Sequence, residues 1–264
     1  MLGVIIFFIL FSIPRMHCLS KEEWYDIVSQ LYNMPFHKDN FVKVSNVVKQ
    51  INTNAQYNKQ LITSTALMVF GKYYLQHMNT LSRSLSAEET VYAGCACFLI
   101  ATKVTNYLCS VDTIMKALGV SERSSKAVKK EVLRLEMEIL IANNFELNFD
   151  MAYNYIKVIK DKIDVDMDCV RTWIYYINDS FLIPLHLKYS ALVIALACLR
   201  MVMNRLNREI DIKEVVRRGE WDAQVDAEEV EECVVIIKEL IYSEDVTGRR
   251  RWNVDSENAG EDKQ

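Results

Sequence analysis

Apolar residues recur with helical spacing along almost the whole chain. They return every three or four positions, which predicts amphipathic helices rather than strands. Short polar or glycine-containing stretches separate the apolar segments, so helix ends can be placed within a few residues. The predicted helices span 21–33, 41–52, 58–77, 87–106, 111–118, 122–144, 149–162, 167–182, 187–206, 212–218 and 227–242. The pattern therefore predicts an all-α protein.

Several helix ends carry their own sequence signals. Three residue pairs have the spacing of a capping box, in which two side chains satisfy free backbone amides at a helix start. These pairs are Ser86 with Glu89, Asp211 with Glu214, and Asp226 with Glu229. Gly119 and Gly219 each follow a short predicted helix, where glycine adopts the left-handed conformation that ends a helix.

The two halves of the helical region repeat one order of elements. Each half has a long helix rich in small residues, then a short helix, a glycine and a longer helix. Ala96-Cys97 coincides with Ala197-Cys198 when the halves are offset by about 101 residues. Small side chains let other helices approach closely, so each small-residue helix is expected at the centre of a five-helix bundle.

The expected architecture is therefore two tandem five-helix domains. Residues 41–148 form the first domain and residues 149–242 the second. Residues 1–40 precede them as an apolar segment and a preparatory helix, and residues 243–264 follow as a polar tail.

Composition agrees with a helical protein and removes other classes. The chain has 264 residues with only seven glycines and three prolines, too few for a linker-rich or turn-dense β protein. It carries 31 Lys and Arg against 35 Asp and Glu, a net charge of −4, so no strongly basic nucleic-acid footprint is present. The seven cysteines form no CxxC pair, which favours free thiols over a zinc ribbon or a disulfide framework.

Enzyme signatures are absent from the sequence. There is no GxGxxG, P-loop or GxSxG motif, and glycine is too scarce for a phosphate cradle. His17, His37, His77 and His186 show no HExxH spacing. No catalytic residue, metal site or cofactor is therefore expected.

The first 14 residues form an apolar run that resembles the core of a signal peptide. The run is too short for an ordinary membrane span and lacks a positively charged start. Met16 is an alternative initiator, in which case the run is an upstream extension. A signal peptide or membrane anchor stays open as an alternative.

Two charged residues lie where apolar positions are expected. Lys103 continues the row of Ala96 and Leu99, which otherwise faces inward. Glu136 borders the apolar stripe of the helix 122–144. Their equivalents in the second half are Asn204 and Ile237, so the repeat does not preserve the charges. A function confined to the first half would produce this difference.

The segments around these residues resemble a known family. Residues 99–104, followed by 133–136 and 145–147, resemble the first cyclin box, and residues 65–74 resemble its second helix. Residues 173–199 resemble transcription-type cyclins, most closely cyclin C, while cyclins H, K, L and T share much of the pattern. Two departures are Thr105-Asn106 in place of a frequent acidic pair and Lys72 in place of a frequent arginine.

The resemblance implies a non-catalytic regulatory subunit that binds and activates a cyclin-dependent protein kinase. The implied complex is a nuclear heterodimer acting in RNA polymerase II transcription, with or without further subunits, and without direct contact to nucleic acid. By the resemblance, Lys103 and Glu136 form a polar clamp on the kinase's C-helix. The implied apolar surface beneath that helix consists of Ile100, Val104, Leu140, Phe145 and Leu147.

Two other functions remain as alternatives at this point. A cyclin-fold transcription factor of the basal factor B type would bind nucleic acid, but it would need a basic face and usually a zinc ribbon. A secreted or membrane-attached helical protein would account for residues 1–14.

Overall fold

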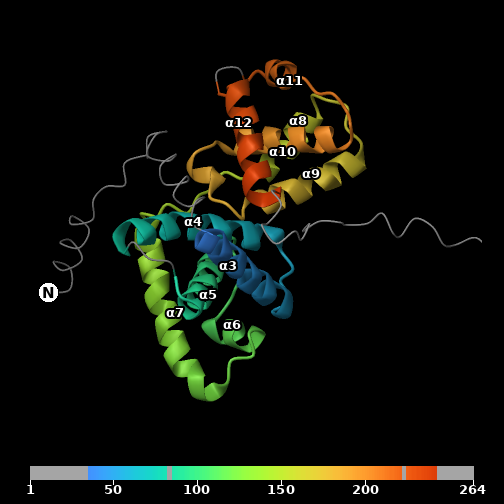
Figure 1. Cartoon of the computed structure of the whole chain (residues 1–264). Coiled ribbons are helices and arrows are strands. Elements are labelled where there is room, and N and C mark those ends of the chain that lie inside the picture. The colour runs from blue at the N-terminus through green and yellow to red at the C-terminus, as the bar shows by residue number, and fades with distance from the viewer. Residues whose placement is uncertain (1–34, 82–84, 222–223, 243–264) are drawn as a thin grey trace, which may run out of the picture.

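The computed structural model describes residues 35–81, 85–221 and 224–242, and all regular elements in these ranges are helical (Figure 1). The first group of helices is α3 (Pro35–Asn54), α4 (Gln60–Leu81), α5 (Ala87–Val104), α6 (Val111–Ala117) and α7 (Glu122–Ala142). The second group is α8 (Tyr153–Lys160), α9 (Met167–Ser180), the short η1 (Leu185–Leu187), α10 (Ala191–Arg205), α11 (Ile212–Gly219), α12 (Ala227–Ile237) and η2 (Lys238–Tyr242).

The predicted all-α architecture is confirmed. Each predicted helix between residues 41 and 242 has an observed counterpart, and most bounds agree within a few residues. The first helix begins earlier than expected, at Pro35. The predicted helix 21–33, the apolar run 1–14 and the tail 243–264 lie outside the described residues.

Helix α5 forms the centre of the first group. It packs against α3, α4 and α7, and its residues from Ala93 to Thr102 are all buried. Gly94 shows why small residues are needed here, because a Cβ atom on Gly94 would lie 2.9 Å from Val47 Cγ1 of α3. The small-residue sequence of α5 therefore permits the close approach of its neighbours.

Helix α10 has the same central place in the second group, where it packs against α8, α9 and α12. Trp173 of α9 is fully buried, and its indole Nε1 donates a 2.8 Å hydrogen bond to the carbonyl of Ala195 in α10. The large ring lies against a small residue of the central helix and still satisfies its one polar group.

The repeat predicted from the sequence recurs in the backbone. Asn106 after α5 and Asn207 after α10 are both left-handed, with φ of 60° and 52°, and they are 101 residues apart. Gly119 after α6 is left-handed as predicted, with φ of 69°. In the second half, however, the left-handed residue is Glu220 and not Gly219, which is still helical.

Gly219 serves a different purpose from the one predicted. A Cβ atom at this position would lie 2.2 Å from the Trp221 ring, so glycine makes room for the indole. The chain reverses one residue later, at Glu220, which keeps the 101-residue offset from Gly119. The wrong prediction followed from treating glycine as a helix-ending signal when its role here is steric.

Only one predicted capping box is complete. The amide of Glu89 donates to Ser86 Oγ at 3.2 Å, and the amide of Ser86 donates to Glu89 Oε2 at 2.8 Å. Asp211 instead accepts from the amide of Lys213 at 2.9 Å, while Glu214 pairs with arginines of its own helix. A single acceptor at the helix start is enough to begin α11.

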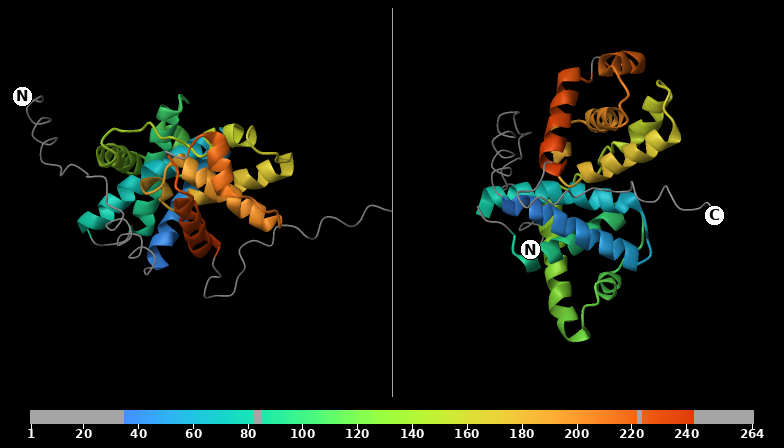
Figure 2. Two further views of the ribbon diagram at one scale, coloured as in Figure 1. Left: turned by 90° about the horizontal axis from the view of Figure 1, so that it is seen from above. Right: turned by 45° about the vertical axis from the view of Figure 1, so that its right-hand side comes forward.

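The two groups of helices meet along α4, which runs across their boundary in both side views (Figures 1 and 2). His186 of η1 makes a polar contact at this junction, because its Nε2 lies 3.1 Å from the carbonyl oxygen of Met68 in α4. Gly71 permits the approach, since a Cβ atom there would lie 2.8 Å from His186 Cε1. Burial, opposed by the Met68 hydrogen bond, lowers the pKa of His186 to about 4.

The packing of α5 predicts that Gly94→Val destabilises the protein. The added side chain overlaps Val47, and overpacking of this kind costs about 1–3 kcal/mol of unfolding free energy. Urea denaturation followed by circular dichroism measures the change. The control is Ala127→Val on the exposed face of α7, which should change stability by no more than about 0.5 kcal/mol. Equal stability of the Gly94 variant and wild type would contradict close α3–α5 packing.

The buried His186 predicts a loss of stability in acid. Below pH 6.5 the unfolded chain binds a proton at this histidine, whereas the folded chain does so only near pH 4. Stability from this group is therefore complete above pH 6.5 and falls as the pH drops towards 4. From pH 6.5 to pH 5 the loss is about 2 kcal/mol. In urea titrations at both pH values, the unfolding free energy of His186→Gln should fall less between pH 6.5 and pH 5 than that of wild type. An equal fall would refute the lowered pKa of His186 as the cause.

Candidate functional site

Lys103 and Glu136, the two charged residues singled out from the sequence, form an ion pair. The distance from Lys103 Nζ to Glu136 Oε1 is 2.5 Å, although the residues are 33 positions apart. Lys103 is in the last turn of α5, and Glu136 lies in the C-terminal half of α7, which packs on α5. The pair is therefore created by the packing of the central helix.

The two partners differ strongly in exposure. The Lys103 side chain is 59% exposed and that of Glu136 only 11%. Glu136 lies at the edge of the stripe of α7 that contacts the core, one residue away from buried Leu135. Lys103 reaches it from the end of α5, where a cation also interacts favourably with the helix dipole. The amine remains accessible to solvent while it compensates a nearly buried carboxylate.

The predicted apolar residues occupy three different depths. Phe145 is 54% exposed, and Ile100 is only 1% exposed. Val104, Leu140 and Leu147 are partly buried and pack against the core. Ile100 is thus a core residue that supports the surface from behind, and direct contact of its side chain with a partner is ruled out in this conformation.

The backbone after α7 holds Phe145 in an unusual conformation. Asn144 and Phe145 are both left-handed, with φ of 52° and 58°, and an aromatic residue rarely adopts this region. The turn is held by a 2.9 Å hydrogen bond from the Phe145 amide to the carbonyl of Leu140. Such strain costs about 1–3 kcal/mol and is concentrated at functional positions.

Contacts with α4 hold the same turn in place. The buried amide group of Asn143 donates to the carbonyl of Val69 at 3.1 Å and to that of Ile139 at 2.8 Å. Lys72 of α4 lies 3.9 Å from the carboxylate of Glu146 and 5.9 Å from the centre of the Phe149 ring. The exposed ring of Phe145 therefore projects from an anchored segment.

The equivalent place in the second half has a different chemistry. Asn204 replaces Lys103 in α10, and Ile237 replaces Glu136 in α12. Ile237 is fully buried, so this position is part of the core there. The ion pair and its surroundings are accordingly a feature of the first group of helices alone.

Two further apolar residues of this surface were missed in the sequence. Leu133 and Met137 of α7 are 50% and 54% exposed, one helical turn apart and close to Glu136 along the helix. The available signal was their position outside the core-facing stripe of Val128, Val132, Leu135 and Ile139. Large apolar residues left outside such a stripe indicate a contact surface.

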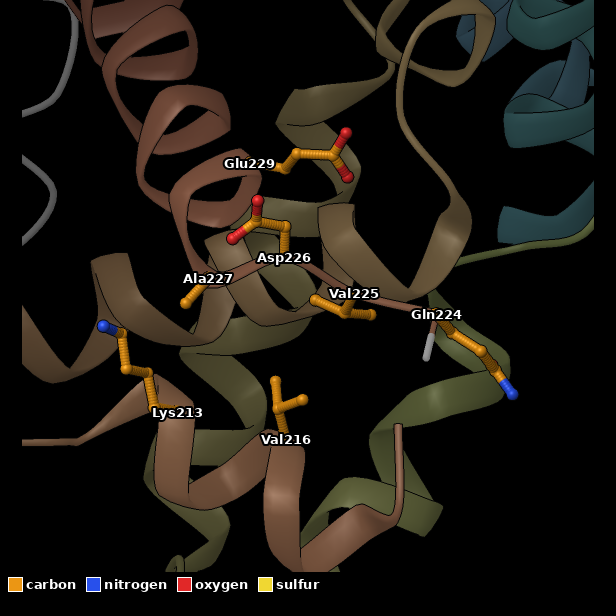
Figure 3. Close-up of a pocket in the computed structure, with 7 residues that line it drawn as sticks. All are labelled: Lys213, Val216, Gln224, Val225, Asp226, Ala227 and Glu229. Atoms are coloured by element: carbon orange, nitrogen blue, oxygen red, sulfur yellow. The ribbon is translucent and has the colours of Figure 1, made fainter. Parts of the chain in front are cut away.

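A groove elsewhere on the molecule offers no comparable site. It lies between α11 and α12, has a volume of about 550 Å³, and is lined by Lys213, Val216, Gln224, Val225, Asp226, Ala227 and Glu229. Figure 3 shows the side chains of Lys213 and Gln224 pointing to opposite sides, so the polar groups do not converge. The Asp226 carboxylate already accepts a hydrogen bond from the amide of Glu228 at 3.0 Å.

The described residues hold neither a metal-binding cluster nor a membrane-spanning helix. Among residues 35–81, 85–221 and 224–242, no three His, Cys, Asp or Glu side chains are grouped to hold a metal ion. No helix in these ranges combines the length and the apolar character needed to cross a bilayer. The surface formed by α5, α7 and the turn after α7 is therefore the candidate site.

The fold resembles that of solved structures of kinase complexes, although no family model and no curated protein sequence matches the chain. A chain of the yeast RNA polymerase II CTD kinase CTDK-1 complex aligns with a TM-score of 0.67 and 17% identity, over 83% of this chain and 71% of that chain. A chain of yeast TFIIK (Kin28/Ccl1/Tfb3) aligns with a TM-score of 0.56 and 19% identity, over 84% and 96%. A chain of the Chaetomium thermophilum CAK complex bound to ATP-γ-S aligns with a TM-score of 0.55 and 13% identity, over 76% of this chain and 62% of that chain. These similarities show a cyclin-box fold.

The strained turn predicts different stabilities for two substitutions of Phe145. Both Phe145→Gly and Phe145→Ala lose the contacts of the half-buried ring, but only glycine removes the left-handed strain, because alanine keeps a Cβ atom at φ of 58°. The unfolding free energy of Phe145→Gly should therefore be about 1 kcal/mol higher than that of Phe145→Ala. Thermal and urea unfolding of both variants measure the difference. Equal stability of the two variants would show that the strain is absent.

Proposed function

We propose that this chain is the regulatory cyclin subunit of a cyclin-dependent protein kinase and has no catalytic activity of its own. The observation that carries the proposal is the Lys103–Glu136 pair, which lies beside exposed and half-buried apolar residues on a cyclin-box fold. In the proposed complex, residues 41–148 form the first cyclin box and bind the kinase. Residues 149–242 form the second box, which lacks the charged pair.

The proposed mechanism is the stabilisation of an active kinase conformation. In protein kinases, the C-helix must lie inward so that its glutamate pairs with the lysine that positions the ATP phosphates. A partner that binds only the inward helix shifts the population towards that state by its differential binding energy. The cyclin surface would supply this energy without touching ATP or substrate.

On this surface the apolar residues would supply binding affinity and the polar residues would set the position of the kinase helix. Leu140, Phe145, Leu147 and Val104 would pack beneath the kinase helix and supply affinity, with Ile100 as support from the core. Because Lys103 and Glu136 lie side by side, they would contact neighbouring backbone groups at one place on the kinase helix. Lys103 would donate to a backbone carbonyl there and Glu136 would accept from a backbone amide, so the pair would set position and register.

The transcription-type assignment rests on the structural similarities and on the motifs in the sequence. Two of the similar structures are named for an RNA polymerase II CTD kinase complex and for TFIIK. By analogy, the proposed kinase phosphorylates the polymerase tail or its regulatory machinery in the nucleus. The subunit would join one kinase, with or without further subunits, and would make no direct contact with nucleic acid.

The proposed clamp predicts that Lys103→Ala combined with Glu136→Ala disrupts kinase binding. If its partners are left buried and unpaired, truncating either residue costs about 2–5 kcal/mol, so the kinase that co-purifies with the chain should bind at least about 30-fold more weakly. Its activation should fall in parallel. Binding is measured by surface plasmon resonance and activation by phosphate transfer to a polymerase-tail peptide.

A matched control removes an ion pair from the second half. Arg171 and Asp168 of α9 are joined at 3.0 Å and are 71% and 88% exposed, so their double alanine variant should bind and activate the kinase as wild type does. Circular dichroism must show both variants folded. Near-normal binding and activation by the Lys103/Glu136 variant would refute the clamp.

A further inference from the structure

The solvent-facing side of α7 has two flanks with different electrostatics. On one flank, Arg134 bonds to Glu131 through its Nε at 2.7 Å and also pairs with Glu138. These three residues are spaced three and four apart and so form a continuous row on the helix. Pairing with Arg134 lowers the pKa of Glu131 and raises that of the guanidinium. This flank pairs its one cation with two carboxylates and so keeps a net negative charge.

The other flank carries basic residues followed by apolar ones. Lys126 and Lys130 are exposed, and within the described part of the chain no carboxylate lies at ion-pair distance from either. Leu133 and Met137 follow at the spacing that continues the same row. Half-buried Leu140 extends the row towards the exposed Phe145. The row therefore changes from positive to apolar as it approaches the proposed kinase-binding surface.

The neighbouring lysine shows that this distribution is specific to the flank. Lys129 forms an ion pair with Asp112 of α6, so its charge is already compensated. The chain as a whole has a net charge of −4, and the two lysines, which form no ion pair within the described residues, are opposite in sign to that net charge. A local positive patch of this kind favours a partner that carries acidic side chains opposite the two lysines.

The distances on α7 define what such a partner must present. The midpoint between Lys126 and Lys130 is seven residues from the midpoint between Leu133 and Met137, which is about 10 Å along a helix. A partner helix packed along α7 would span the same distance in about two turns. It would place acidic side chains at one end and apolar side chains at the other.

We infer that Lys126, Lys130, Leu133 and Met137 extend the kinase-binding surface along α7 and select a kinase helix whose acidic turn lies about two turns from its apolar contact. This inference rests on the proposed function. It adds a specificity element, because the lysines would steer association through charge while Leu133 and Met137 would hold the docked helix through apolar burial.

Charge reversal and apolar removal test the two parts separately. The full-length variants are Lys126→Glu with Lys130→Glu, and Leu133→Ser with Met137→Ser, all at exposed positions. The matched control is Lys157→Glu with Lys162→Glu at exposed positions of the second half. Surface plasmon resonance measures association and dissociation of the co-purifying kinase at 50 mM, 150 mM and 1 M salt.

The two variants should fail in different ways. The lysine variant should associate about tenfold more slowly at 50 mM salt, with the difference lost at 1 M salt. The Leu133/Met137 variant should dissociate about tenfold faster at every salt concentration. The control should match wild type. Unchanged rates for both variants, or faster association of the lysine variant, would overturn the inference.

Binding by the wild-type chain and by the Lys103/Glu136 variant shows whether a negative result refutes the α7 extension alone or the proposed function as well. If the kinase binds wild type and is lost from the Lys103/Glu136 variant while both α7 variants bind normally, only the extension of the surface is wrong. If no kinase binds wild type, the proposed function itself fails and the inference fails with it.

Discussion

The structure depends on the enclosure of α5 from Ala93 to Thr102 by its neighbours. A helix segment buried on all sides must have small residues where another helix crosses it closely, and Gly94 against Val47 is such a crossing. This enclosure also determines the candidate site, because Lys103 lies in the last turn of α5 and α7 lies against that helix with Glu136 alongside. The Lys103–Glu136 pair and the exposed turn at Phe145 are consequences of how α4 and α7 pack around one central helix.

Much of this fold could be predicted from the sequence because local signals and apolar periodicity agreed. The central helices were recognised from the runs around Ala96 and Ala197, and the repeat from their 101-residue offset. The left-handed residue after α11 was misplaced, because Gly219 makes room for Trp221 while Glu220 makes the turn. Local propensity does not reveal which of two adjacent residues reverses the chain when the side chain of Trp221 requires the glycine for its own packing.

The site was predictable only in part. Lys103 and Glu136 were recognised as charges at inward or border positions, and their motifs resembled a cyclin box, but periodicity could not show that they meet across 33 residues. Exposure was harder to predict, because Ile100 is a core residue whereas Leu133 and Met137 face solvent. Exposure depends on which helices surround a residue in the folded structure, and the local sequence pattern does not contain this information. The strain at Phe145 likewise arises from the anchoring of the turn to α4 through Asn143.

The two halves show how one scaffold can be divided between structure and recognition. The buried Ile237 occupies the place that corresponds to Glu136, so a core contact in one half matches a charged surface in the other.

The most direct measurement is purification of the tagged full-length chain from its native cells, with quantitative mass spectrometry of what it retains and an assay on a polymerase-tail peptide. We expect one protein kinase in a one-to-one ratio, and phosphorylation of the peptide by the purified complex. The absence of any stoichiometric kinase would contradict a cyclin function and leave Lys103–Glu136 as an ordinary surface ion pair.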